Sequence, residues 1–297
     1  MKYLKPNSSL PFPEDDWERK FEKKLRKHTG LVLGFSLLTA CGLLAGILCF
    51  YLMFQNGLYF VLPFSGLFLH AWMILLVHEG AHRNLTRSCL DRWILNLASA
   101  FVFLPFYGEP FRKIHLYHHA HTNAADDPLW PEWKKNLFQS RRKLYVFVEL
   151  VPLFSNVAAI LFKKRDSANL KKRLSSIRLH SAVRSILFLC FSFSVSILLY
   201  IELKPNLWFV FGSFLFANVW GSLRHWCEHT GLRTDLESNT FSFPLGMGIG
   251  NHETHHADPS LSWISLSAGL RRRIKTMNIR DCVRGIWSNP KYFHYEP

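Results

Sequence analysis

The stretch "LVLGFSLLTACGLLAGILCFYLMFQNGLYFVLPFSGLFLHAWMILLVHEGAH" (residues 31–82) decides the fold, because it holds two long apolar runs around one short connector. Residues 31–54 contain no charged side chain, and roughly 20 apolar residues suffice for a helix to cross a bilayer. Residues 57–77 form the second run after the connector "QN". Because neither run has a polar face, the pattern predicts a transmembrane hairpin rather than buried helices of a water-soluble protein.

A second pair of apolar runs follows later in the chain, at residues 185–201 and 206–223, separated by "ELKP". Two further apolar stretches, 93–108 and 144–162, are expected to lie in the membrane interface or to be half-inserted. A single extra crossing would put the early and late histidine motifs on opposite sides of the membrane. The predicted fold class is therefore an all-α integral membrane protein with four transmembrane helices in two hairpins, together with interfacial helices.

The distribution of lysine and arginine predicts the orientation. The formal net charge is +15, and the cations gather before residue 31, over 163–178 and over 269–284. Because cytoplasmic loops are enriched in Lys and Arg, both ends and the middle region are expected in the cytoplasm. The predicted division is a cytosolic tail (1–30) with a short amphipathic helix, a membrane domain (31–285) and a C-terminal tail (286–297). Cations that flank apolar runs predict contact with the bilayer surface and no nucleic-acid partner.

The six cysteines form no CxxC pair, and three of them lie inside the proposed spans. This pattern favours neither a disulfide framework nor a thiolate zinc site.

Ten of the fifteen histidines gather in four short motifs: "HEGAH", "HLYHH", "RHWCEHTG" and "NHETHH". Residues three or four positions apart share one face of a helix, so the imidazoles of one motif can reach the same metal ion. The candidate metal ligands are His78, His82, His115, His118, His119, His225, His229, His252, His255 and His256.

Ten nitrogen donors are too many for one ion, which accepts about four to six, and suit two. Neighbouring helical side chains diverge by about 100°, so the pairs 118/119 and 255/256 can each serve both ions. The sequence therefore predicts a dinuclear site. All-nitrogen ligation beside a bilayer that delivers apolar substrates favours iron and O₂ chemistry.

Two other classes of protein share parts of this pattern. "HEGAH" also fits the H-E-x-x-H signature of zinc proteases, with Glu79 as general base, but that interpretation leaves eight histidines unexplained. A non-catalytic metal carrier would be expected to place ligating residues within the spans, where this chain has few ionisable groups.

Three motifs in this order, His78–His82, His115–His119 and His252–His256, followed in the second case by "HTN" and "DDP", resemble the histidine boxes of the membrane fatty acid desaturase superfamily. The resemblance spans about residues 30–270. It implies four spanning helices under a cytosolic cap that carries the boxes, and two iron ions with O₂ as co-substrate. His225 and His229 match the family's additional ligand positions, His225 less closely. His121 falls where relatives usually carry an aromatic residue and is expected not to bind metal.

The resemblance further implies an oxidoreductase of lipid metabolism that desaturates a long fatty acyl chain. Hydroxylation or ketolation of a lipid or carotenoid remains open, because the boxes occur in all these branches. No dinucleotide fingerprint is present, so a separate electron donor of the ferredoxin or cytochrome b5 type is expected. No catalytic residue is expected beyond the metal site. Nearby carboxylates are candidates for orienting the imidazoles, namely Glu79, Asp126, Asp127, Glu228, Glu253 and Asp258.

Overall fold

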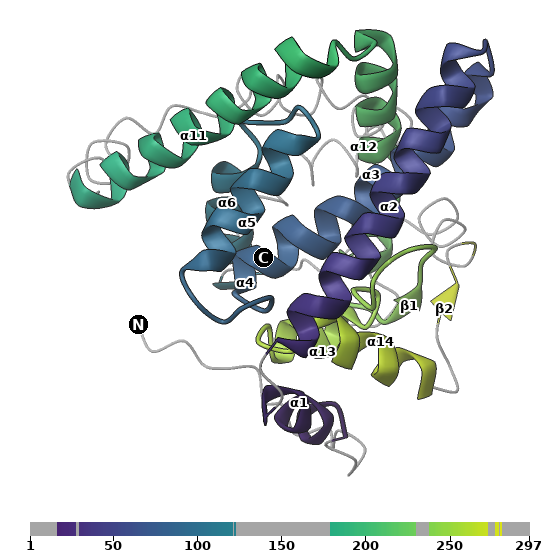
Figure 1. The fold of residues 1–297 in the computed structure, drawn as a ribbon. Coiled ribbons are helices and arrows are strands. Elements are labelled where there is room, and N and C mark those ends of the chain that lie inside the picture. The colour runs from purple at the N-terminus through teal and green to yellow at the C-terminus, as the bar shows by residue number, and fades with distance from the viewer. Residues whose placement is uncertain are drawn as a thin grey trace, which may run out of the picture.

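The computed structural model describes residues 17–27, 30–120, 122, 179–229, 238–272, 277–278 and 280 (Figure 1). The expected interfacial stretch 144–162 and the C-terminal tail 286–297 lie outside these residues.

The first predicted hairpin is present. Helix α2 (Leu31–Gln55) is followed, after a short turn, by a continuous helical rod that ends in "HEGAH". The rod consists of a 3₁₀ turn η1 (Tyr59–Val61), α3 (Leu62–Trp72), a π-helical segment η2 (Met73–His78) and α4 (Glu79–His82). A π-helical segment has wider turns than an α-helix and is found mostly at functional sites. Here it comes directly before the first histidine motif and sets the direction in which that motif faces.

The second pair consists of α11 (Leu179–Leu203) and α12 (Leu207–His229). Helix α12 packs along α3, and α11 packs on α5 (Leu90–Phe101). Hydroxyl groups bridge α3 and α12, since Ser65 Oγ lies 2.8 Å from Ser213 Oγ. Helices α5 and α11 are joined in a similar way, because Ser196 Oγ donates to the Ala100 carbonyl at 2.9 Å. Small and polar residues at helix contacts are typical of membrane helix bundles.

Within the part of the chain that the structure describes, three helical stretches are long and apolar enough to cross a membrane: Leu31–Gln55, Tyr59–His82 and Val183–Leu203. Helix α12, which holds the fourth expected span (206–223), is less apolar, because Asn218 lies inside this span and Arg224 directly follows it. The structure is thus mostly helical, as predicted, with three candidate spans. Large apolar side chains on α2 and α11 point outward without cover, including Leu38 at 71% and Leu187 at 63% exposure, as expected of surfaces that contact lipid.

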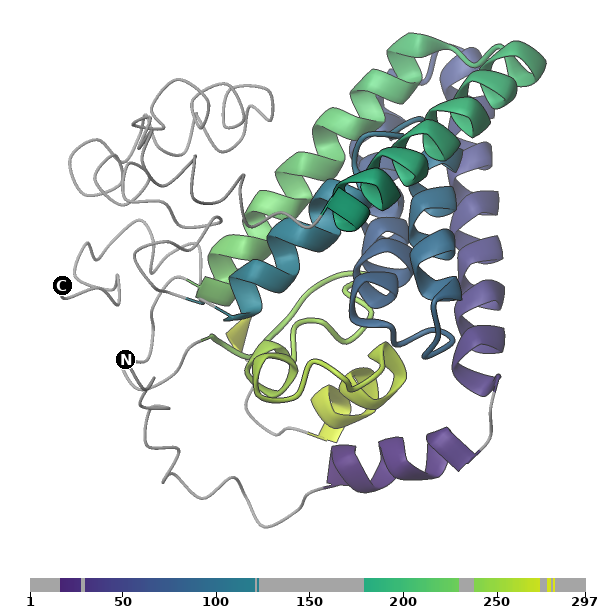
Figure 2. The same ribbon diagram turned by 90° about the vertical axis from the view of Figure 1, so that its left-hand side faces the viewer.

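The remaining elements gather at one end of these helices (Figure 2). They are α6 (Gly108–Ala120), α13 (His252–Ala257), α14 (Trp263–Arg272) and α1 (Trp17–Lys27). Strands β1 (Phe241–Ser242) and β2 (Met277–Asn278) pair in parallel, with Phe241 opposite Met277. This two-residue pairing is a small departure from the all-α expectation. Cys41, Cys49, Cys89 and Cys190 are exposed free thiols.

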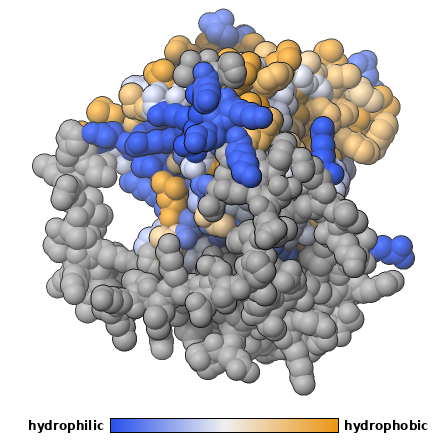
Figure 3. All heavy atoms as spheres, turned by 90° about the horizontal axis from the view of Figure 1, so that it is seen from below, coloured by the Kyte–Doolittle hydropathy of each residue, from blue (hydrophilic) through white to orange (hydrophobic). Residues whose placement is uncertain are grey.

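Helix α1 is the amphipathic helix that the sequence predicts, and one buried carboxylate fastens it. Glu22 is 1% exposed and accepts hydrogen bonds from Ser262 Oγ at 2.7 Å and Ser265 Oγ at 2.6 Å, both near the start of α14. Arg87 forms an ion pair with the same carboxylate. Seen from the end at which α1 lies, the molecule shows a cluster of hydrophilic side chains (Figure 3). The exposed cations of α1 are Lys20, Lys23, Lys24, Arg26 and Lys27.

The contact between α3 and α12 depends on Gly66. A Cβ atom there would lie 2.4 Å from Phe216 Cβ and 2.7 Å from the Ala217 backbone nitrogen. We therefore expect Gly66→Ala to force the helices apart and to lower the stability by roughly 1–3 kcal/mol. The measurement is thermal unfolding of the purified protein in detergent. Gly34→Ala is the matched control, because its added methyl group meets nothing within 4 Å. Equal melting temperatures of the two variants would contradict this account of the contact.

Candidate metal centre

All ten predicted histidines lie within the described residues, and the fold brings them together at one place. They come from four segments: the end of the rod at α4, helix α6, the last turns of α12, and α13. Gly80, inside the first motif, permits the close packing of α4 on α5, since a Cβ atom there would lie 2.9 Å from Leu95 Cβ. The packing of the helices thus brings together histidine motifs that are far apart in the sequence.

The first group of imidazoles contains five residues whose nitrogens all lie within 4.8 Å of one another. They are His78, His82, His115, His119 and His255. His115 Nε2 lies 2.8 Å from His82 Nε2 and 3.2 Å from His119 Nε2. His255 Nε2 lies 3.1 Å from His119 Nε2. The Nε2 atoms of three different segments therefore converge on one point.

The second group is built around His118, His229 and His256, whose nitrogens also lie within 4.8 Å of one another. His252 adjoins this group, because its Nε2 is 3.2 Å from His229 Nε2 and 3.1 Å from His256 Nε2. His225 forms an overlapping set with Glu228 and His229, at the edge of the group.

The two members of each adjacent pair fall in different groups. His119 and His255 belong to the first group, whereas His118 and His256 belong to the second. The two groups adjoin, since the rings of His119 and His256 stack with centroids 4.3 Å apart. This is the division that the divergence of neighbouring helical side chains leads us to expect.

The spacing of the nitrogens suits metal ligation. Two nitrogens that bind one ion at about 2.1 Å and at right angles to each other lie about 3.0 Å apart. The five Nε2–Nε2 separations observed here range from 2.8 to 3.2 Å. His78 Nε2 is buried and has no hydrogen-bond partner among the described residues. A cation between the imidazoles would satisfy these nitrogens, so the residues fit a bound metal, and an all-imidazole donor set suits iron, zinc, copper or nickel.

Burial favours the neutral form of four of the imidazoles on α6 and α13. It lowers the pKa of His115, His252 and His255 well below the ordinary value, and neighbouring histidines lower each of them further. The same effect of burial lowers the pKa of His256. Neutral imidazole is the form that binds a metal ion, so these side chains are available as ligands at neutral pH.

Two of the predicted carboxylates contact the second nitrogen of a histidine. Glu79 Oε1 lies 3.5 Å from His78 Nδ1, and its Oε2 accepts a hydrogen bond from the Trp263 backbone N–H at 2.9 Å. Glu228 Oε1 lies 3.3 Å from His252 Nδ1, and Arg224 pairs with the same carboxylate. Such contacts fix the orientation of an imidazole.

The other predicted carboxylates are placed differently. Asp258 accepts hydrogen bonds from the backbone and hydroxyl of Ser260. Glu253 is half-buried on α13. Asp126 and Asp127 lie outside the described residues, as does His121.

One contact at the centre was missed by the sequence reasoning. Thr122 donates from Oγ1 to the His118 carbonyl at 2.8 Å and lies 3.1 Å from His256 Nδ1. Thr122 therefore links the second histidine motif to the fourth. In the sequence, this role was indicated only by the position of Thr122 directly after "HLYHHAH". His70, by contrast, belongs to none of the metal-competent sets found among the described residues, and packs against Phe243 inside the bundle.

Comparison with known proteins gives one match. The family described as fatty acid desaturase matches residues 55–277, which is more than half of the chain and includes all ten histidines. No curated protein and no solved structure matches. The chain therefore belongs to the fatty acid desaturase family, which implies a lipid-modifying oxidase.

Proposed function

We propose that the protein is a membrane-bound di-iron oxidase that uses O₂ and external electrons to desaturate a long fatty acyl chain. One observation carries this proposal: ten histidines form two adjoining groups, each with nitrogens spaced for a single ion. Family membership supports a lipid as substrate. Two iron ions rather than one zinc ion account for the number of donors.

Each ion has its own set of proposed ligands. The first set is His78, His82, His115, His119 and His255, and the second is His118, His229, His252 and His256, with His225 at its edge. Iron bound there would supply the electron-transfer chemistry that lets O₂ oxidise an unactivated C–H bond.

In this proposal the protein's own side chains bind the metal ions and orient the imidazoles that serve as ligands. We assign the histidines as metal ligands rather than as acids or bases, because burial lowers the pKa of His115, His252 and His255 and favours their neutral form. Glu228 and the Ile249 carbonyl both lie 3.3 Å from His252 Nδ1 and orient this imidazole, whereas Glu79 lies beside His78 Nδ1 at 3.5 Å. Because Glu79 also accepts from the Trp263 backbone, its carboxylate is already engaged by two groups. This argues against a general-base role for Glu79 in a zinc protease, the remote alternative.

We further propose four membrane crossings, with α12 as the fourth and the metal centre on the cytoplasmic side. The short connector between α11 and α12, and the packing of α12 along α3, support a paired crossing. Helix α1, which carries exposed cations, lies at the same end of the molecule as α13, which carries three of the histidines (Figure 1), and this supports a cytosolic cap there. The electron donor is then a separate protein of the ferredoxin or cytochrome b5 type that docks on this cap.

The first test is metal content. We expect purified protein to hold about two iron ions per chain, because each ion needs about four to six donors. His82→Ala should lower the content by weakening the first site and His229→Ala by weakening the second, as measured by elemental mass spectrometry. His70→Gln, outside both groups, should keep both ions. One zinc ion in place of two irons would favour the protease instead.

A second test concerns Glu228. Glu228→Gln keeps the size of the side chain but removes the charge that faces His252 Nδ1. Loss of such an orienting contact typically lowers metal affinity by about 10–100-fold. Iron retention during titration with a chelator measures the effect. Glu253→Gln, at a half-buried position on α13, is the matched control and should retain iron like the unchanged protein.

The third test identifies the reaction. The protein is expressed in a host of defined lipid composition, and extracted lipids are analysed by mass spectrometry. Desaturation predicts acyl products that have lost two hydrogens, and these products should disappear with His118→Ala or His255→Ala. A gain of one oxygen would instead indicate the hydroxylase alternative. Altered carotenoids with unchanged acyl chains would indicate a ketolase or hydroxylase of pigments.

A further inference from the structure

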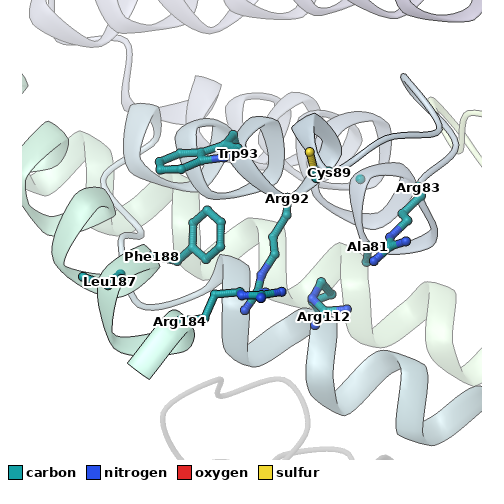
Figure 4. Close-up of a pocket in the computed structure, with 10 residues that line it drawn as sticks. Ala81, Arg83, Cys89, Arg92, Trp93, Arg112, Arg184, Leu187 and Phe188 are labelled. Atoms are coloured by element: carbon teal, nitrogen blue, oxygen red, sulfur yellow. The ribbon is translucent and has the colours of Figure 1, made fainter. Parts of the chain in front are cut away.

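A cavity of about 420 Å³ lies beside the metal centre, between α4, α5, α6 and α11 (Figure 4). Its described lining includes Gly80 and Ala81, which separate the two histidines of the first motif. A cavity of this size lies within the range of small-molecule sites, about 300–1,000 Å³. The proposed ligand set uses none of its lining residues.

Four guanidinium groups line the cavity, those of Arg83, Arg92, Arg112 and Arg184. They come from four separate stretches of the sequence, and Figure 4 shows their side chains reaching toward the same region. One buried carboxylate, Glu109, contacts two of them: it accepts two hydrogen bonds from Arg92, at 2.9 and 2.6 Å, and lies 3.6 Å from Arg112. Among the described lining residues four are cationic and none is acidic, so this part of the lining is positive. Guanidinium groups bind phosphate by paired N–H donors, so this lining suits a phosphate ester.

The other side of the cavity is apolar. Trp93, Leu187 and Phe188 line it, and the Arg92 guanidinium lies 4.4 Å above the Phe188 ring. The rings of Trp93 and Phe188 meet edge to face with centroids 4.7 Å apart. The pocket thus joins a cationic half to an aromatic and aliphatic half.

The position of the cavity relates it to the bilayer. Arg184 is the second residue of the candidate span Val183–Leu203, so it lies at the boundary between the apolar and polar parts of α11. Leu187, one turn further into the span, is 63% exposed. On α5, an exposed apolar stripe leads away from the cavity through Leu90, Trp93, Leu97 and Phe101. A ligand with its charge among the arginines would therefore lay an apolar tail along α5 and α11.

From this arrangement we infer that the cavity binds an anionic glycerophospholipid of the surrounding leaflet, with its phosphate among the four arginines and an acyl chain against Trp93, Leu187 and Phe188. Basic pockets between membrane helices hold anionic head groups by the same electrostatics. The inference does not depend on the proposed oxidation, because it concerns binding alone.

The test measures lipid binding to the purified full-length protein in detergent by native mass spectrometry. Dioleoyl phosphatidic acid should bind about tenfold more tightly than dioleoyl phosphatidylcholine, whose choline cation faces the same arginines. Arg83→Gln/Arg184→Gln should lower the affinity for phosphatidic acid by about tenfold or more. The matched control, Lys23→Gln/Arg271→Gln, removes the same charge from exposed positions on α1 and α14 and should bind like the unchanged protein.

A single-residue variant and a competition measurement complete the test. Arg184→Gln alone changes an exposed residue on a helix that carries none of the ten histidines, and should still weaken binding several-fold. Glycerol 3-phosphate, a head group without a tail, should fail to displace the lipid at equal concentration. The inference is overturned if the cavity variants and the control variant lose the same affinity for phosphatidic acid. It is also overturned if the unchanged protein does not prefer phosphatidic acid to phosphatidylcholine. Displacement by glycerol 3-phosphate would identify a site for soluble phosphates instead and would also overturn it.

Discussion

The convergence of buried imidazole nitrogens is the constraint on which the rest of the structure depends. Nitrogens from four separate helical segments lie 2.8–3.2 Å apart in a buried or half-buried place. One ring nitrogen of a neutral imidazole is either a donor or an acceptor, so His115 Nε2 cannot be satisfied by both of the Nε2 atoms that approach it, those of His82 and His119. A cation bound between these nitrogens would resolve this conflict. The helices must then hold the four segments within a few tenths of an ångström of their places.

Buried carboxylates supply much of that rigidity. Glu79 ties the first histidine motif to the backbone at the start of α14, and Glu228 ties α12 to His252. Glu22 fastens α1 to the same helix α14 through two serine hydroxyls. Each carboxylate accepts several hydrogen bonds or pairs with an arginine, which offsets the free energy of burying its charge. The end of the bundle is therefore a connected polar network above an apolar base.

Much of this could be predicted from the sequence. The apolar runs predict the helices correctly because the bilayer requires about 20 apolar residues per crossing, whatever the neighbours. The i, i+4 spacing of His78 and His82 predicts a shared face because helical geometry is local. Even the division of the histidines into two groups could be anticipated, since adjacent residues such as His118 and His119 must diverge. The fourth crossing stays a prediction, because α12, with Asn218 and Arg224, is less apolar than the other expected spans.

The sequence by itself determined the helices, their apolar faces and the set of ten histidines, because these follow from local periodicity and residue chemistry. Only the tertiary structure decided which histidine joins which group. It also decided that Glu79 meets Trp263, that Thr122 meets His256, and that four distant arginines enclose one cavity. The physical reason is that these contacts join segments separated by up to 184 residues. Their geometry depends on helix packing, including the π-helical turn before His78, which no local pattern encodes.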